Sequence, residues 1–266
     1  MLLASFFGLA IGLILGLTGA GGGILAVPAL VLGLGWPMTQ AAPVALMAVG
    51  ASAALGAVDG LRQGLVRYRA ALLMALLGGA FTPLGLYFAH RLPEDLLMGL
   101  FSLVLVLVAM RMHRQARGAQ GVAAEHGWQQ KNCMLDASTG RLRWTLRCGL
   151  TLAAVGSCCG LLTGLLGVGG GFLLVPAFRQ LTDIRLHGIV ATSLMVIALV
   201  SLMAIVGAVR AGVVIPPAGG VFIVASVLGM LAGRIAAPHV PPRALQNGFA
   251  GLCLLVAAYL LCKTFA

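Results

Sequence analysis

The stretch from Gly16 to Pro28 reads GLTGAGGGILAVP, and the stretch from Gly164 to Pro176, 148 residues later, reads GLLGVGGGFLLVP. Nine of the thirteen positions are identical. Each copy places three consecutive glycines inside an apolar run and a proline five residues after the last of them. Glycine within a helix costs about 1 kcal/mol per position relative to alanine. The repeated triplets therefore predict two breaks in otherwise helical segments. Because this cost occurs twice, we expect the breaks to serve a function.

The composition around these two stretches is typical of an integral membrane protein. Of the 266 residues, 61% are hydrophobic and 9% are charged, whereas soluble domains are about 25% charged. The mean hydropathy is +1.06. Because a spanning helix takes about 20 apolar residues, we expect an all-α integral membrane protein without a large soluble domain. The net charge of +11 fits an excess of Lys and Arg in cytoplasmic loops, so we expect no nucleic acid partner.

Apolar segments occur in two groups of four, and the first segment of each group contains a glycine triplet. The eight segments span approximately residues 2–34, 40–58, 70–89, 96–110, 146–178, 188–209, 213–237 and 244–261. A polar, basic stretch separates the two groups. We therefore expect one membrane domain over residues 1–266, built from a first repeat at 1–112, a basic cytoplasmic connector at 113–143 and a second repeat at 144–266.

The match between the two halves extends beyond the glycines in the same register. Further identities at this offset are Leu46 with Leu194, Met47 with Met195, Gly64 with Gly212, Gly85 with Gly233, Pro93 with Pro241 and Phe101 with Phe249. A gapless register that includes proline and phenylalanine indicates an internal duplication. Membrane transporters are often built in this way.

Two arrangements of the halves are open. If each glycine-broken segment crosses the membrane once, the halves are parallel and Lys plus Arg divide 12 to 5 between the two sides. If each is a re-entrant hairpin, the halves are inverted and the division is 14 to 3. The positive-inside rule favours inverted repeats, with both termini outside and the connector inside. Length agrees, because about 33 residues of helix are roughly 50 Å long and the hydrocarbon core is about 30 Å thick.

The glycine motifs can form an anion site without a charged side chain. A helix that starts after a break presents free N–H groups and about half a positive charge, and glycine lets a ligand approach the backbone closely. The expected substrate-binding residues of the motifs are Thr18, Gly19, Gly21, Gly22, Gly23, Gly167, Gly169, Gly170 and Gly171, and the helix-break prolines are Pro28 and Pro176. The alternative is close helix packing, which we favour for Gly12 and Gly16 because they are spaced by four residues.

The twin GxGGGx(4)P motifs and the duplicated four-segment halves resemble the sulfite exporter TauE/SafE family, also called the TSUP permeases, over nearly the whole chain. The resemblance implies a multi-pass carrier of the cell inner (plasma) membrane that exports sulfite, sulfoacetate or another organosulfonate, or thiosulfate. A Thr-Ser pair that recurs in the family is matched here by Thr192 and Ser193. The corresponding first-half residues are not hydroxylic, and Thr39, Gln40 and Ser52 are the nearest polar candidates on that side.

Few charged or metal-binding residues accompany the apolar segments. Asp59 could exchange protons, but we favour its pairing with Arg62 at the helix end. Arg185 and His187 are candidates for attracting anions at the cytoplasmic mouth, although a solvated basic face explains them equally well. The six cysteines show no CxxC spacing and demand no disulfide, and the histidines show no metal-ligand spacing. We expect neither a metal nor a cofactor, and we do not expect an enzyme.

These features together predict a secondary carrier that exports a small sulfur-containing oxyanion by alternating access around the paired glycine breaks. An inside-negative potential supplies about 2.3 kcal/mol per charge per 100 mV, which favours export of an anion. An anion-selective channel and a carrier for a different small organic anion are the alternatives. Coupling to protons or to the potential, and the oligomeric state, are left open by the sequence.

Overall fold

The computed structural model describes residues 1–18, 22–118, 133, 145–182, 186–210, 216–239 and 242–265, and within them the regular structure is helical. Helices account for all eight predicted apolar segments, and both glycine-containing segments are broken. The elements are α1 (Leu2–Thr18), η1 (Gly22–Leu25), α2 (Ala26–Gly33), α3 (Met38–Arg62), α4 (Tyr68–Arg91), α5 (Glu94–Gly118), α6 (Leu146–Leu166), α7 (Gly171–Leu181), α8 (Leu186–Arg210), α9 (Pro217–Ala236), η2 (Ala237–His239) and α10 (Pro242–Phe265).

Local sequence explains several of the helix ends. Thr145 precedes α6, and its hydroxyl accepts the Cys148 N–H at 3.2 Å, which satisfies one of the free donors of the first turn. α9 begins with Pro217 at its first position, where the missing proline N–H has no cost. α3 ends at Arg62, and Gly64, whose φ of +68° suits glycine, turns the chain toward α4.

The first glycine-broken segment is a helical hairpin. α1 ends at Thr18, and after the break the four-residue 3₁₀ turn η1 leads into α2, which is only eight residues long. At the end of α2, Gly33 packs against the ring of Phe7 near the start of α1. The chain therefore doubles back along α1, and the two ends of this hairpin lie on the same side.

The second glycine-broken segment is also a hairpin. Cys133 links its two ends, which are the start of α6 and the end of α7. The Cys133 N–H donates to the Leu181 carbonyl at 3.0 Å, at the end of α7, and Cys133 forms a disulfide with Cys148 at the start of α6. Both ends of the hairpin therefore meet at one residue of the connector. This disulfide corrects the sequence analysis, in which no cysteine pair stood out because Cys133 and Cys148 are 15 residues apart without a recognisable spacing.

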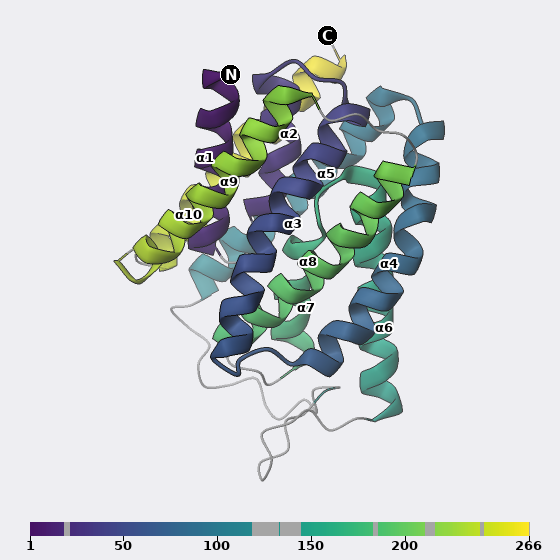
Figure 1. Ribbon diagram of the computed structural model, residues 1–266, viewed down its shortest axis with the longest axis vertical. Coiled ribbons are helices and arrows are strands. Elements are labelled where there is room, and N and C mark those ends of the chain that lie inside the picture. Colours follow the sequence, from purple (N-terminus) through teal and green to yellow (C-terminus); the bar gives the residue numbers. More distant parts are fainter. Residues whose placement is uncertain are drawn as a thin grey trace.

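Helices α3 and α8 cross at the centre of the molecule (Figure 1). Gly50 of α3 lies against Ser201 of α8, and ten residues later Gly60 lies against Ala191. Contacts that advance along α3 and retreat along α8 mean that the two helices are antiparallel. α9 packs beside α3 and α4 beside α8, so this pair is enclosed on both sides.

Two seams of glycine join the first arm of each hairpin to a helix of the other half. In the first seam, Gly8, Gly12 and Gly16 of α1 lie against Phe222, Ser226 and Met230 of α9. In the second seam, Gly156, Gly160 and Gly164 of α6 lie against Met74, Gly78 and Thr82 of α4. In both seams the contacts advance together, so the paired helices are parallel. The packing role that we favoured for Gly12 and Gly16 is confirmed by these contacts.

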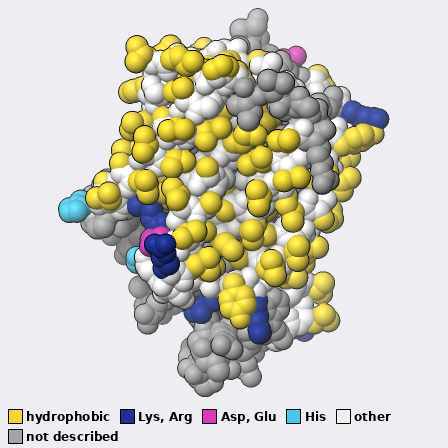
Figure 2. All heavy atoms as spheres, viewed as in Figure 1, with side chains coloured by type: hydrophobic (Ala, Val, Ile, Leu, Met, Phe, Trp, Pro, Cys, Tyr) yellow, Lys and Arg dark blue, Asp and Glu magenta, His cyan; other side chains and the backbone are white. Residues whose placement is uncertain are grey.

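Among the described residues, five helices are long and apolar enough to cross a membrane: α3, α4, α6, α8 and α9. The outer surface is correspondingly apolar, and Figure 2 shows hydrophobic side chains covering most of the face in view. Large exposed apolar residues include Leu72 and Leu76 of α4, Leu228 of α9, and Leu255 of α10. α5 and α10 pack against each other, and both chain termini lie at the same end of the molecule (Figure 1).

Candidate substrate site at the glycine breaks

The two glycine breaks meet against the central α3–α8 pair. A Cβ on Gly23, in the first break, would lie 3.3 Å from the Val168 carbonyl oxygen of the second break and 3.0 Å from Val49 of α3. A Cβ on Gly169, in the second break, would lie 3.3 Å from the same Val49 side chain and 3.4 Å from Ile197 of α8. The motifs belong to opposite halves of the sequence, and the fold brings them together at one buried position.

The second break depends on backbone conformations that favour glycine. Gly167, Gly169 and Gly170 have φ values of +71°, +72° and +63°, a region that other residues adopt at a cost of roughly 1–2 kcal/mol. The Gly170 carbonyl accepts the N–H groups of the third and fourth residues of the α7 run at 3.1 and 3.4 Å. The N–H groups of Gly171 and Phe172 have no intrahelical acceptor, so α7 presents its positive N-terminal end at the break.

In the first break, the described residues form a tightly wound 3₁₀ turn in place of the left-handed glycines of the second break. Gly22 and Gly23 begin the 3₁₀ turn η1, and Gly23 has no positive φ. The Thr18 hydroxyl, at the end of α1, donates to the Ile14 carbonyl at 2.8 Å. Gly19 and Gly21, two predicted substrate-binding residues, lie outside the described residues. The close contacts of Gly23 show why a side chain is unfavourable there even without an unusual backbone.

The two motif prolines lie in the second arms of the hairpins. Pro176 lies inside α7, where it removes the N–H that would bond the carbonyl of Phe172 four residues earlier. Pro28 lies in the first turn of α2 and is buried. Neither proline lies at the break itself, so the glycines, and not the prolines, shape the position where the motifs meet.

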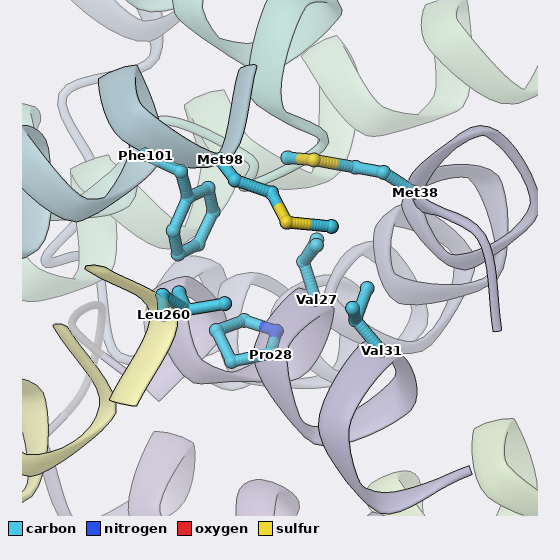
Figure 3. A pocket seen from close by; sticks show the side chains of 7 residues that line it. All are labelled: Val27, Pro28, Val31, Met38, Met98, Phe101 and Leu260. Carbon is cyan, nitrogen blue, oxygen red and sulfur yellow. The ribbon is translucent and has the colours of Figure 1, made fainter. Parts of the chain in front are cut away.

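Pro28 faces a small apolar pocket instead (Figure 3). The pocket lies between α2, the start of α3, α5 and α10. Its lining residues are Val27, Pro28, Val31, Met38, Met98, Phe101 and Leu260. None of these side chains can donate a hydrogen bond, so this pocket offers no ligand for an anion, and the glycine breaks remain the better candidate site.

Four buried serine hydroxyls of the described residues have no hydrogen-bond partner: those of Ser52, Ser193, Ser201 and Ser226. Ser201 lies closest to the breaks, because a Cβ on Gly169 would be 3.8 Å from its Oγ. An unsatisfied buried hydroxyl costs about 1–3 kcal/mol. Sequence analysis did not select Ser201. The available signal was its spacing, since Ser193, Ile197 and Ser201 follow every fourth residue and share one face of α8.

The Thr-Ser pair divides between two roles. The Thr192 hydroxyl donates to the Gly188 carbonyl at 2.7 Å and accepts the Arg67 N–H at 3.1 Å, which ties the α3–α4 turn to α8. Both hydrogen-bonding functions of Thr192 are thus used by the protein. Ser193 is fully buried and its hydroxyl is free of such contacts. Of the two, only the Ser193 hydroxyl is left without a hydrogen-bond partner.

Two predicted first-half candidates lie far from the breaks. Thr39 and Gln40 are exposed in the first turn of α3. Gln40 precedes Val49 by nine residues, which is about 14 Å of helix. The structure therefore does not bring these side chains to the position where the two breaks meet.

The charged candidates lie at the helix ends. Asp59 Oδ2 accepts a hydrogen bond from the guanidinium of Arg234, in α9, at 2.5 Å. The predicted pairing of Asp59 with Arg62 is wrong, because α9 packs beside α3 and presents Arg234 to the carboxylate. His187 is exposed in the first turn of α8, and Arg185 lies outside the described residues.

The fully buried polar residues among those described are all serines and threonines, and the Nε of the half-buried Arg67 is also buried. Within the same residues, no group of three or more His, Cys, Asp or Glu side chains could hold a metal ion. The polar chemistry available at the centre consists of hydroxyls and the backbone N–H groups at the start of α7. These groups suit recognition of an oxyanion by hydrogen bonds.

Comparison with known proteins identifies the family of the chain. The family model "Sulfite exporter TauE/SafE" matches residues 4–260. A "Probable membrane transporter protein" from Xylella fastidiosa (strain 9a5c) is 28% identical over 264 residues, covering 96% of this chain and 93% of that protein, and its counterpart from strain Temecula1 matches to the same extent. No solved structure gives a significant match. The chain is a multi-pass membrane transporter that belongs to the sulfite exporter TauE/SafE family.

Proposed function

We propose that this transporter is a secondary carrier that exports a small sulfur-containing oxyanion across the inner membrane by alternating access around the two glycine breaks. Candidate substrates are sulfite, an organosulfonate and thiosulfate. The observation that carries the proposal is the meeting of the two breaks, with the free N–H groups of Gly171 and Phe172 at the start of α7. A family of this name and the curated transporter relatives support the general class.

Inverted repeats at 1–112 and 144–266, joined by the connector at 113–143, are part of the proposal. Each broken segment returns to the side from which it started, and three further helices follow in each half, so the number of crossings per half is odd. In the register of the repeat α8 is the counterpart of α3, and it runs antiparallel to α3. The two glycine seams are also counterparts in this register, which supports a two-fold relation between the halves.

Orientation follows from the basic residues. α6 starts at the end of the molecule opposite both termini (Figure 1). The connector and the α3–α4 turn, with Arg62, Arg67 and Arg69, belong to the side that carries 14 of the 17 Lys and Arg residues. The positive-inside rule assigns that side to the cytoplasm. Disulfides in the cytoplasm are usually transient, so the bond between Cys133 and Cys148 is expected to form there only under oxidation.

The occluded site favours a carrier over a channel. Ser193 and Ser201 are both fully buried, with 0% of their surface exposed. An open pore would expose the groups that contact the ion, whereas a carrier passes through states in which they are closed on both sides. The membrane potential alone would drive a monovalent anion outward by about 50-fold at 100 mV.

The test is efflux from proteoliposomes under an imposed potential, with sulfite and methanesulfonate as probes. Gly23→Leu combined with Gly169→Leu places side chains where the two breaks meet and should abolish flux. The matched control combines Gly99→Leu with Gly251→Leu, because a Cβ at either of these helix positions meets nothing within 4 Å. Circular dichroism and gel filtration establish that each variant is folded.

Saturable, voltage-dependent flux in the wild type and the control, lost in the folded double variant, is the expected result. Flux that does not saturate would favour an anion-selective channel. Flux of carboxylates without flux of sulfur anions would favour a carrier for other organic anions. Equal flux from the double variant would mean that the glycines only pack helices.

A further inference from the structure

We infer that the site at the two glycine breaks selects monoanions over dianions and that the Ser201 hydroxyl donates a hydrogen bond to the bound oxyanion. This inference rests on the proposed transport of sulfur oxyanions and narrows its substrate class. It favours bisulfite and monosulfonates. It disfavours sulfate, thiosulfate and sulfoacetate, which each carry two charges near neutral pH.

Ser201 occupies the point where α8, α3 and the second break come together. Gly50 of α3 leaves room for it, because a Cβ on Gly50 would lie 2.6 Å from the Ser201 Cβ and 3.3 Å from its Oγ. On its other side, the Oγ lies 3.8 Å from the Cβ position of Gly169. The hydroxyl is thus buried beside the backbone of the break that leads into α7.

Four of the five buried serines of the described residues lack a hydrogen-bond partner, and Ser201 is the one shown beside the second break. Serine and threonine in helices commonly donate to the carbonyl four residues earlier. Thr82, Thr163 and Thr192 all do so, at 2.7 Å in each case. The Ser201 hydroxyl has no hydrogen-bond partner although it is fully buried. A bound oxyanion would supply the acceptor and remove the cost of about 1–3 kcal/mol for the unpaired group.

Other unpartnered hydroxyls lie along the two central helices. Ser193 precedes Ser201 by two helical turns on the same face of α8. Ser52 follows Val49 of α3 by three residues, and Val49 contacts both breaks. All three serines are fully buried. Eight residues of helix are about 12 Å, so a small oxyanion bound at Ser201 does not reach Ser193, and the two hydroxyls mark separate positions along one face of α8.

The positive charge available to the anion is limited. The helical runs that begin at Gly22 and Gly171 each contribute about half a charge at the N-terminus, so the two together offset about one negative charge. The fully buried polar side chains of the described residues are uncharged, and the half-buried Arg67 has a buried Nε without a hydrogen-bond partner. Arg67 contacts α8 through its backbone at Thr192, nine residues and about 14 Å along the helix from Ser201. A second negative charge would be buried without compensation, which is costly.

The first experiment compares three anions in proteoliposomes containing the full-length wild type. Methanesulfonate is a monoanion and sulfate a dianion throughout the neutral range, while sulfite changes from monoanion to dianion within it. We expect kcat/KM for sulfate to be at least about tenfold lower than for methanesulfonate, which corresponds to about 1.4 kcal/mol. Sulfite flux measured on either side of its second ionisation should follow one curve when plotted against the bisulfite concentration. Methanesulfonate flux reports any effect of pH on the protein itself.

The second experiment tests Ser201 directly. Ser201→Ala should raise KM for methanesulfonate about tenfold, because a hydrogen bond to a charged group is lost, and Ser201→Thr, which keeps the hydroxyl, should recover part of the effect. Ser226→Ala is the matched control. Ser226 is also buried and unpartnered, but it lies in the α1–α9 seam against Gly12, and its KM should equal that of the wild type.

The outcomes separate the inference from the function on which it rests. No flux of any sulfur anion would overturn the proposed function. Sulfate transport as efficient as methanesulfonate transport would overturn the monoanion inference and leave the carrier intact. An unchanged KM in folded Ser201→Ala, or an equal rise in Ser226→Ala, would overturn the role of Ser201.

Discussion

The two hairpins share nine of thirteen motif residues but use them for different physical reasons. In the α6–α7 hairpin, Gly167, Gly169 and Gly170 adopt left-handed backbone conformations, so the break depends on the dihedral freedom of glycine. In the α1–α2 hairpin, Gly23 belongs to a 3₁₀ turn and is needed for its close approach to Val168 and Val49. An identical motif therefore does not imply an identical cost of substitution.

The second arms of the two hairpins, α2 and α7, also have different surroundings. α2 borders the apolar pocket with Met98 of α5 and Leu260 of α10 (Figure 3). The end of α7 instead meets the connector at Cys133, which is bonded to Cys148. The hairpin at the end of the molecule with both termini is thus held by apolar packing, and the opposite hairpin is held in addition by a covalent bond.

The largest expected effect tests what the two hairpins have in common, which is the glycine seam along the first arm. A Cβ on Gly12 would collide with the Ser226 backbone, and a Cβ on Gly160 would collide with the Gly78 backbone. Gly12→Leu and Gly160→Leu should each abolish the folded protein, measured as the monodisperse fraction in detergent. Gly99→Leu, where the added atoms meet nothing within 4 Å, should fold normally. A tolerated leucine in only one seam would show that the two first arms are not equivalent.

A smaller effect tests where the hairpins differ. Gly170→Ala combines an unfavourable φ of +63° with a collision against Cys159 Sγ, and we expect a loss of about 2 kcal/mol or more. Gly23→Ala requires Val49 and Val168 to move by only a few tenths of an ångström, and we expect a loss of about 1 kcal/mol or less. Thermal unfolding in detergent, read against Gly99→Ala, measures the difference. Equal losses would contradict the distinction between the two breaks.

The smallest effect concerns the ion pair between α3 and α9, in which Asp59 has no acidic counterpart in the second half of the chain. Asp59 pairs with Arg234, while the residue at the offset of 148 from Asp59 is Gly207. The side chains of Arg234 and Asp59 are 31% and 47% exposed, so solvent weakens the attraction, and Asp59→Asn should cost less than about 1 kcal/mol. A double-mutant cycle with Arg234→Gln should give a coupling of about 0.5 kcal/mol that falls with added salt. A coupling of Asp59 to Arg62 instead would contradict the observed pairing.

Much of the fold was accessible from the sequence because it depends on local patterns. Apolar runs long enough to span a bilayer predicted the helices, and the glycine triplets predicted both breaks. The partners of side chains were not accessible, because they depend on contacts between distant segments. Asp59 pairs with a residue 175 positions away and not with the arginine one turn along its own helix. The four-residue spacing of Ser193, Ile197 and Ser201 places Ser201 on one face of α8, but its position beside Gly50 and Gly169 depends on the fold.

The polar candidates of the first half show the same limit. Thr39 and Gln40 are polar residues close in sequence to the first-half counterparts of Thr192 and Ser193, but the helical rise carries them about 14 Å or more from Val49. Thr192 was chosen with Ser193, yet its hydroxyl is used in holding the α3–α4 turn. Of these two neighbours, Thr192 therefore has a structural role, and only Ser193 keeps a hydroxyl without a hydrogen-bond partner.

The glycine seams also set an order of events during synthesis. Gly160 follows Gly78 by about 80 residues, so α6 can meet α4 soon after it enters the membrane, whereas Met230 follows Gly16 by more than 200 residues. At about 5–20 residues per second, α1 waits some 10–40 s before α9 exists to cover its glycine face. The nascent chain should therefore assemble the second glycine seam first, and α1, although made first, should meet α9 only after α6 has paired with α4.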